Sequence, residues 1–344
     1  MRPRGTAMAC DGTRTGGSVL ILVMWTLVFL SALAIAVASY VDAGLRLAGK
    51  MKNLAGAGQA ARAGVEKAIM DAAADTNSWD SFDESWNSSE DLFKDVPLGE
   101  GFYSIQSVRR PSGGQAVTNY GLVDEESRIN INTASRELIT AGIEAAGGVD
   151  HGTAVELAAS IVDWRDPDDD ALTGGAEKSY YQGLDQSYRC RNAEFQTMRE
   201  LLLVKGVSYD LFVKIAPYLT VHGAGRVNIN TADEAVLKSV ARVAGGADAT
   251  VADSLAGKIA GFRGGGGVFK APVPAEIVRQ LKQSVALTPA EEGVLAGMMG
   301  MLTTQSGCFG GVATGRMKNS AADEVAVEFV FDREKGSKLN WYVR

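Results

Sequence analysis

Residues that commonly carry enzyme chemistry are scarce in this 344-residue chain. It has only two histidines, His151 and His222, and three cysteines, with no Cys-x-x-Cys pair, nucleophile elbow or phosphate loop. The four glycines at 264–267 lack the Lys-Ser/Thr ending of a phosphate loop and favour a flexible turn. We therefore expect no catalytic activity.

Positive charge is also in the minority, with 34 Lys and Arg against 41 Asp and Glu and a net charge of −7. An acidic balance argues against non-specific nucleic-acid binding as the main task. Hydrophobic residues make up 46% of the chain, which is enough to build a core in more than one domain.

Residues 19–41 carry no charged side chain and form one continuous apolar run, and the rest of the chain is interpreted relative to it. A helix of that length can cross roughly 30 Å of hydrocarbon. Arg2, Arg4 and Arg14 precede it with a single Asp11, which favours a cytoplasmic N-terminus. We expect residues 18–41 to form a single transmembrane segment, with the remainder of the chain on the far side of the membrane.

Three interpretations of this run stay open. A secretory signal would be cleaved after the small residues 36–38, but the run exceeds the usual 7–15-residue core of such signals. A plain signal anchor would not be cleaved. The third interpretation rests on Gly16 and Gly17, which directly precede the run. Residues 1–17 thereby resemble a type IV prepilin leader, and in that family a prepilin peptidase cuts after the glycine, here between Gly17 and Ser18.

One residue of the apolar run departs from the prepilin pattern. Counted from Ser18, the fifth residue is Leu22, where most pilins and pseudopilins carry a Glu. A carboxylate at that depth costs free energy unless it is paired, and in the family it faces the N-terminal amine of the adjoining subunit. The resemblance therefore implies a subunit that caps the assembly.

Secondary-structure patterns follow the apolar run. Residues 42–74 are rich in alanine and continue the helical spacing, so we expect one long helix whose second half lies on a sheet. Residues 103–108 and 117–123 have strand patterns around a turn at 111–114. Residues 325–343 alternate as a β-hairpin that turns at 334–337.

This order predicts an α+β fold with an inserted domain. We expect a pilin-like α/β domain from residues 42–123 and 322–344, and an inserted helical domain from residues 124–321. The acidic stretch at 75–100 carries four aromatic residues, which favour local core packing over a partner-binding stripe.

The insertion contains a repeated motif. Asn-Ile-Asn-Thr-Ala occurs at 130–134 and again at 228–232, 98 positions later. The same offset relates Arg165 to Arg263, whereas Phe195 matches Phe269 at an offset of 74, so the first copy has 24 extra residues. We predict an internal duplication with copies at about 128–221 and 226–300.

Each copy is expected to be a small helical unit, because Asn and Thr before an apolar helical pattern can cap a helix and Thr231 with Glu234 forms a capping box. Such units are similar to helix-hairpin-helix modules, including those of the competence DNA-receptor family. A membrane-anchored DNA-uptake protein is therefore an alternative function, and an uncharacterised anchored enzyme is a third. The turn at 146–150 is acidic rather than basic, which disfavours phosphate binding.

Four traits together resemble the K-type minor pseudopilins of the type II secretion system (general secretion pathway protein K). They are the leader without the fifth-position Glu, the strand into residues 130–134, and the stretches at 161–181 and 200–207. The resemblance implies a protein at the tip of a periplasmic pseudopilus, in contact with I-type and J-type minor pseudopilins. It also implies a calcium-binding loop in the insertion and no catalytic activity.

An acidic loop falls within the 24 extra residues of the first copy. Four acids occupy positions 1, 3, 5 and 12, the spacing of an EF-hand calcium loop: Asp166, Asp168, Asp170 and Glu177. Position 6 departs from that pattern, because Ala171 replaces the glycine. We expect calcium here, with Asp169 as an additional candidate ligand; the alternative is a solvated acidic loop.

The cysteines leave two alternatives. If the leader is removed, Cys10 goes with it, and Cys190 and Cys308 remain in an oxidising compartment. Their spacing is compatible with a disulfide and equally with two buried free thiols.

Overall fold

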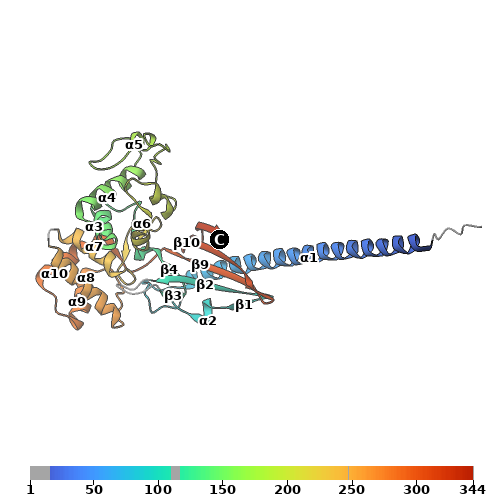
Figure 1. The fold of residues 1–344 in the computed structure, drawn as a ribbon. Helices are drawn as coiled ribbons and strands as arrows, with labels where there is room; N and C mark the ends of the chain where they lie inside the picture. Colours follow the sequence, from blue (N-terminus) through green and yellow to red (C-terminus); the bar gives the residue numbers. More distant parts are fainter. Residues whose placement is uncertain (1–15, 110–116, 247, 344) are drawn as a thin grey trace, which may run out of the picture. The chain divides into compact units, whose positions relative to one another are not determined.

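The computed structural model describes residues 16–109, 117–246 and 248–343 (Figure 1). Contacts divide the chain into two units, Met1–Ala55 and Gly56–Arg344. Most of the predicted leader, with Cys10, and the predicted turn at 111–114 lie outside the described residues.

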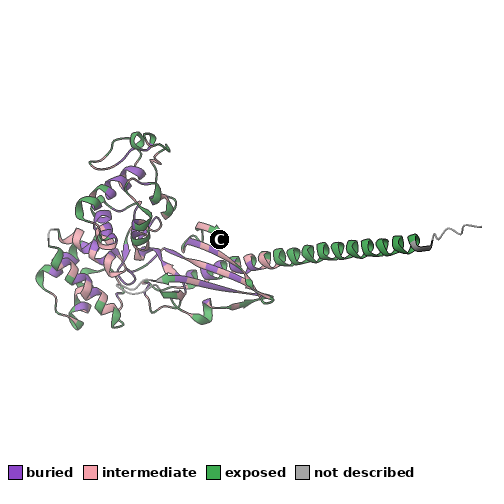
Figure 2. Ribbon diagram, viewed as in Figure 1, coloured by how far each residue is buried: buried purple, intermediate pink, exposed green. Residues whose placement is uncertain are grey.

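Helix α1 (Gly16–Ala74) supplies the whole of the described first unit. From residue 18 to residue 50 its side chains are exposed (Figure 2). Among the described residues it is the one helix long and apolar enough to cross a membrane, with a mean hydropathy of 2.7. The predicted continuous helix is thus confirmed.

In the second unit the end of α1 packs on a sheet. Small residues at helical spacing make this contact: Ala57, Ala61, Val65, Ala68 and Ala72. The backbones approach so closely that a Cβ atom on Gly315 would lie 2.0 Å from the carbonyl oxygen of Ala57. Glycine is therefore required at position 315.

The sheet is antiparallel, with strand order β1-β2-β9-β10-β11, while β3 pairs with β2 and β4 with β9. Its strands are β1 (Val96–Leu98), β2 (Gly101–Arg109), β3 (Val117–Tyr120), β4 (Val123–Asp124), β9 (Cys308–Met317), β10 (Ser320–Asp332) and β11 (Lys338–Val343). The predicted C-terminal hairpin is confirmed, with Phe329 opposite Trp341.

Strand β9 corrects the predicted domain boundary. It lies between β2 and β10 at the centre of the sheet, so the insertion ends before Cys308 rather than at residue 321. Its sequence has glycine where a strand pattern has large side chains, at Gly310, Gly311 and Gly315. These glycines serve close backbone packing, which the alternation of apolar residues does not reveal.

The acidic aromatic stretch before β1 contains α2 (Glu90–Phe93) and contributes to the core beneath the sheet. Trp86 and Phe93 are buried, and the Trp86 ring meets Phe309 edge-to-face at 4.9 Å between centroids. The predicted local core role of these two aromatics is confirmed.

The insertion is mainly helical. The turn η1 (Glu125–Ser127) follows β4 and precedes the first copy, which contains β5 (Ile129–Asn130), α3 (Arg136–Gly147), α4 (His151–Arg165), α5 (Lys178–Gln182), η2 (Met198–Leu203), α6 (Tyr209–Ile215), η3 (Ala216–Tyr218) and β6 (Leu219–Thr220). The second copy contains β7 (Val227–Asn228), α7 (Glu234–Gly245), α8 (Ala249–Gly264), α9 (Pro274–Ser284), α10 (Pro289–Met298), η4 (Met299–Met301) and β8 (Leu302–Thr303).

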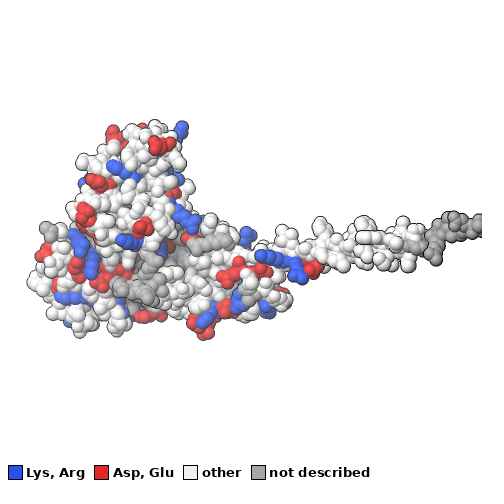
Figure 3. All heavy atoms as spheres, viewed as in Figure 1, with Lys and Arg blue, Asp and Glu red and all other residues white. Residues whose placement is uncertain are grey.

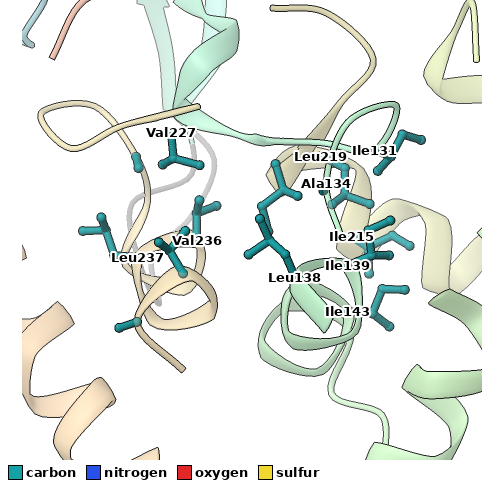
Figure 4. Close-up of a cluster of buried hydrophobic side chains, with 14 of the residues drawn as sticks. Ile131, Ala134, Leu138, Ile139, Ile143, Ile215, Leu219, Val227, Val236 and Leu237 are labelled. Atoms are coloured by element: carbon teal, nitrogen blue, oxygen red, sulfur yellow. The ribbon is translucent and has the colours of Figure 1, made fainter. Parts of the chain in front are cut away.

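One apolar core runs through both copies (Figure 4). Leu138 of α3 and Val236 of α7 are among its buried side chains, and these two helices pack against each other. Each copy also closes on a two-residue parallel pairing, β5 with β6 and β7 with β8.

The repeated asparagines make equivalent contacts. Asn132 Nδ2 donates to the carbonyl oxygen of Phe195 at 3.0 Å, and the Phe195 N–H donates to Asn132 Oδ1 at 2.8 Å. Asn230 and Phe269 repeat this reciprocal pair at 2.8 and 2.9 Å. Each asparagine thus ties the start of its copy to the segment after the second helix. The classification as a helix-hairpin-helix stays a prediction.

Candidate metal centre

The acids of the first copy converge at one end of the insertion, near α5 (Figure 1). Carboxylate oxygens of Asp163, Asp166 and Glu177 lie within 4.8 Å of one another. Asp163 is in the last turn of α4, Asp166 is the residue that ends this helix, and Glu177 is the residue before α5. Helix end and helix start therefore bring three carboxylates together.

These carboxylates are largely withdrawn from water. Asp163 is 0% and Glu177 2% exposed, and both Glu177 oxygens and Oδ1 of Asp166 are buried without a hydrogen-bond partner. Burial, reinforced by the charges of Asp166 and Asp163, raises the pKa of Glu177 to about 7. Burial likewise raises the pKa of Asp163 and of Asp166. Such a group favours a cation, because buried carboxylates are stable only when paired or ligating.

The loop between α4 and α5 is shaped around Asp163. The N–H of Leu172 donates to both Asp163 oxygens at 3.2 Å. Gly174 has a φ of +85°, and a Cβ on Gly175 would lie 2.0 Å from Asp163 Oδ2. The two glycines therefore let the loop backbone reach the carboxylate and deliver Glu177 two residues later.

The predicted ligand set needs correction. Asp166 and Glu177 meet, but Asp168 and Asp170 are exposed and outside the group, and the Asp170 N–H donates to Asp168 Oδ1 at 2.9 Å. Asp169, the additional candidate, pairs instead with Lys178 at 3.7 Å. EF-hand spacing assumes that the loop winds around its own ion, whereas this loop folds back against the end of α4.

Asp163 was absent from the predicted set, although two signals pointed to it. It precedes Asp166 by three residues, which places the two on one face of a helix. The second copy has Gly261 at the position that corresponds to Asp163, so this acid accompanies the extra segment of the first copy.

A second acidic group, Asp75, Asp80 and Glu84, is already compensated. The guanidinium of Arg333 donates to both oxygens of Asp80 at 2.7 and 3.1 Å and lies 3.7 Å from Asp75. Because Arg333 pairs with two of these acids, and the Ser81 N–H and Trp86 Nε1 donate to Glu84, we do not assign a metal here.

The cysteines do not form a disulfide: both are free. Cys190 lies in the insertion, with Sγ 3.9 Å from the carbonyl oxygens of Asp163 and Trp164. Cys308 is buried at the start of β9, where its N–H donates to Glu126 Oε2 at 3.1 Å. They therefore belong to different parts of the core, and the disulfide alternative is wrong in this structure.

Three comparisons with known proteins agree. The family model of type II secretion system protein K matches residues 127–224. Type II secretion system protein K of Aeromonas hydrophila is 40% identical over 81 residues, 23% of this chain and 24% of that protein. Its counterpart from Pectobacterium carotovorum subsp. carotovorum is 33% identical over 89 residues, 25% and 27% of the two chains.

The chain spans about a quarter of the length of these curated relatives in the matched region. The likeness in fold covers more of the chain than the likeness in sequence. A chain in the crystal structure of the GspK-GspI-GspJ complex from the enterotoxigenic Escherichia coli type 2 secretion system matches with a TM-score of 0.56. The match covers 90% of this chain and 96% of that one at 15% identity. Residues 127–224 are thus similar to part of type II secretion system protein K, in line with the resemblance of the sequence, and the likeness in fold extends over most of the chain.

Proposed function

We propose that this protein is the tip subunit of a type II secretion pseudopilus, anchored in the inner membrane by α1 with the second unit in the periplasm. The match of the K-type family model to residues 127–224 carries the proposal, because this segment holds the first copy of the insertion. Leu22 supports the position at the tip, since a subunit with no neighbour above it has no amine to pair with a carboxylate. Its task is to assemble with I-type and J-type minor pseudopilins so that folded proteins can leave the periplasm.

Co-purification tests this assembly. The tagged full chain, extracted in detergent from its own cells, should bring down the I-type and J-type minor pseudopilins in equal amounts. A tip subunit should be far rarer than the major pseudopilin in the same preparation. Recovery of the chain without the I-type and J-type minor pseudopilins would argue against this assembly. A chain as abundant as the major pseudopilin, as expected of a subunit that recurs along the fibre, would argue against a place at the tip.

The DNA-uptake alternative gains no support from the face that Figure 3 shows. On the face in Figure 3, acidic and basic side chains are interspersed over the inserted domain. DNA binding of useful strength needs clustered Lys and Arg, because most of its free energy comes from phosphate contacts.

Processing by prepilin peptidase is a separate part of the proposal. We expect the mature chain to begin at Ser18, since Gly17 directly precedes an uncharged apolar run. Gly17→Glu should leave the precursor uncut, because a large charged residue would replace the small one at the cleavage point. Mass spectrometry of the membrane-extracted N-terminus measures this. Cleavage after Ala38, or an intact Met1 in cells with an active peptidase, would contradict it.

We also propose that Asp163, Asp166 and Glu177 hold a calcium ion. The residues fit this cation: carboxylate oxygens are its preferred ligands, and the Glu177 carboxylate is buried with both oxygens free to ligate. Bound calcium would offset two of the three negative charges and join the end of α4 to the start of α5. The second copy, which has Gly261 in place of Asp163 and lacks the acidic loop, would need no ion to fold.

A further inference from the structure

Lys205 reaches the acidic loop from another part of the insertion. It follows η2, and its ammonium donates to the carbonyl oxygens of Gly174 and Gly175, both at 3.1 Å. The same ammonium lies 5.3 Å from the centroid of the Tyr180 ring. The Lys205 backbone is fixed as well, because its N–H donates to the buried Tyr181 hydroxyl at 3.2 Å.

The two carbonyls that Lys205 holds belong to the turn that lies against Asp163. Gly175 sits so close to this carboxylate that no side chain fits between them. Two residues later the chain places Glu177 beside Asp166. A lysine that fixes the turn therefore also fixes the separation between the α4 carboxylates and Glu177.

Lys205 has two opposite effects on a cation in this group. Its positive charge is near enough to Asp163 to favour the ionised carboxylate, and the same charge repels a second cation. Its two hydrogen bonds hold the loop in the conformation that brings the acids together. A charge effect and a positioning effect thus predict opposite consequences when the lysine is removed.

We infer that Lys205 is a positioning residue of the metal centre, and that its hydrogen bonds to the loop backbone outweigh its repulsion of the ion. This inference rests on the calcium site proposed above. It goes beyond that site because Lys205 carries a positive charge and is no ligand. Partners that orient ligands typically change metal affinity by about 10- to 100-fold when removed.

Calcium titration of the full chain in detergent, followed by calorimetry, tests the inference. Lys205→Met should weaken calcium binding about tenfold or more. Lys178→Met is the matched control, because Lys178 adjoins Glu177 but is 53% exposed and pairs with Asp169. Its loss removes a nearby positive charge, so affinity should stay the same or rise. Lys205→Arg should restore part of the affinity, since a guanidinium keeps donors for both carbonyls.

Gly175→Ala alters the same turn but keeps both carbonyl groups that accept hydrogen bonds from Lys205. Its methyl group would displace the loop from Asp163, so calcium binding should weaken, and combination with Lys205→Met should add little. Wild-type affinity or tighter binding in Lys205→Met would overturn the inference while the calcium site stands. A wild-type chain that does not bind calcium would overturn the calcium proposal and this inference with it.

Discussion

Calcium should raise the unfolding temperature of the inserted domain by about 5–10 °C over the chelator-treated chain. A ligand at a free concentration of 100 times its dissociation constant adds about 2.7 kcal/mol to the free energy of unfolding. Each 1 kcal/mol raises the unfolding temperature of a domain of this size by about 2–4 °C. The effect should be large because the ion relieves the repulsion among two buried carboxylates and the half-buried carboxylate of Asp166. Differential scanning calorimetry of the full chain in detergent, with calcium and with chelator, measures it.

Variants then distinguish the observed group from the EF-hand spacing. Asp163→Ala with Glu177→Ala should abolish the calcium shift, whereas Asp170→Ala should retain it, because Asp170 is exposed and outside the group. Glu177→Gln should also lose the shift, yet be more stable than wild type in chelator, since it removes one of three repelling charges. Equal shifts in wild type and in the Asp163/Glu177 variant would exclude this site.

The second large effect concerns pH and the turn η1, which joins the sheet to the insertion. Asp124 accepts hydrogen bonds from Asn228, Thr231 and Ser306, which come from the second copy and the return to the sheet. Glu126, two residues along, accepts from the Cys308 N–H at 3.1 Å. Both acids are 3% exposed.

Burial, and then the charge of Asp124, raises the pKa of Glu126 from 4.5 to about 8. The folded chain therefore holds a proton at neutral pH that the unfolded chain has released. The contribution of the Glu126 carboxyl group to the free energy of unfolding is fully present below pH 4.5 and is lost as the pH rises through about 8. The slope is at most about 1.4 kcal/mol per pH unit.

Urea unfolding between pH 5 and 9 in chelator measures this loss. Asp124, Asp80 and Glu177 also have a raised pKa, chiefly through burial, and titrate in the same direction, so the comparison must be with Glu126→Gln. That variant keeps the shape of the side chain and cannot ionise, so its stability should fall less steeply from pH 5 to 8. Identical slopes for the two chains would show that Glu126 is ionised in the fold.

The elements that could be predicted from the sequence are those with a repeating pattern. The apolar run and alanine spacing indicated α1, and strict alternation indicated the hairpin of β10 and β11. Strand β9 could not be found in this way, because Gly315 is required by the close approach of the α1 backbone, which lies far away in the sequence. Long-range packing of this kind leaves no local signature.

The candidate site, like the fold, could be predicted from the sequence only in part. The acidic loop was located, and Asp166 and Glu177 belong to the group, but spacing within the loop suggested the wrong companions. Asp163 comes from the preceding helix, and Lys205 comes from a segment about 30 residues beyond the loop turn. Which side chains meet depends on how the loop folds against α4, and that is set by contacts such as the one between Gly175 and Asp163. The cleavage at Gly17 and the binding of calcium stay predictions.

The pairing of β4 with β9 has a consequence for how the insertion can vary in length. Val123 lies opposite Gly310 and Asp124 opposite Phe309, so the chain leaves the sheet and re-enters it on adjacent hydrogen-bonded strands. The entropy of closing a loop between fixed ends rises only slowly with its length. The sheet can therefore keep its register whatever the length of the insertion, including the predicted duplication and the 24 extra residues of its first copy.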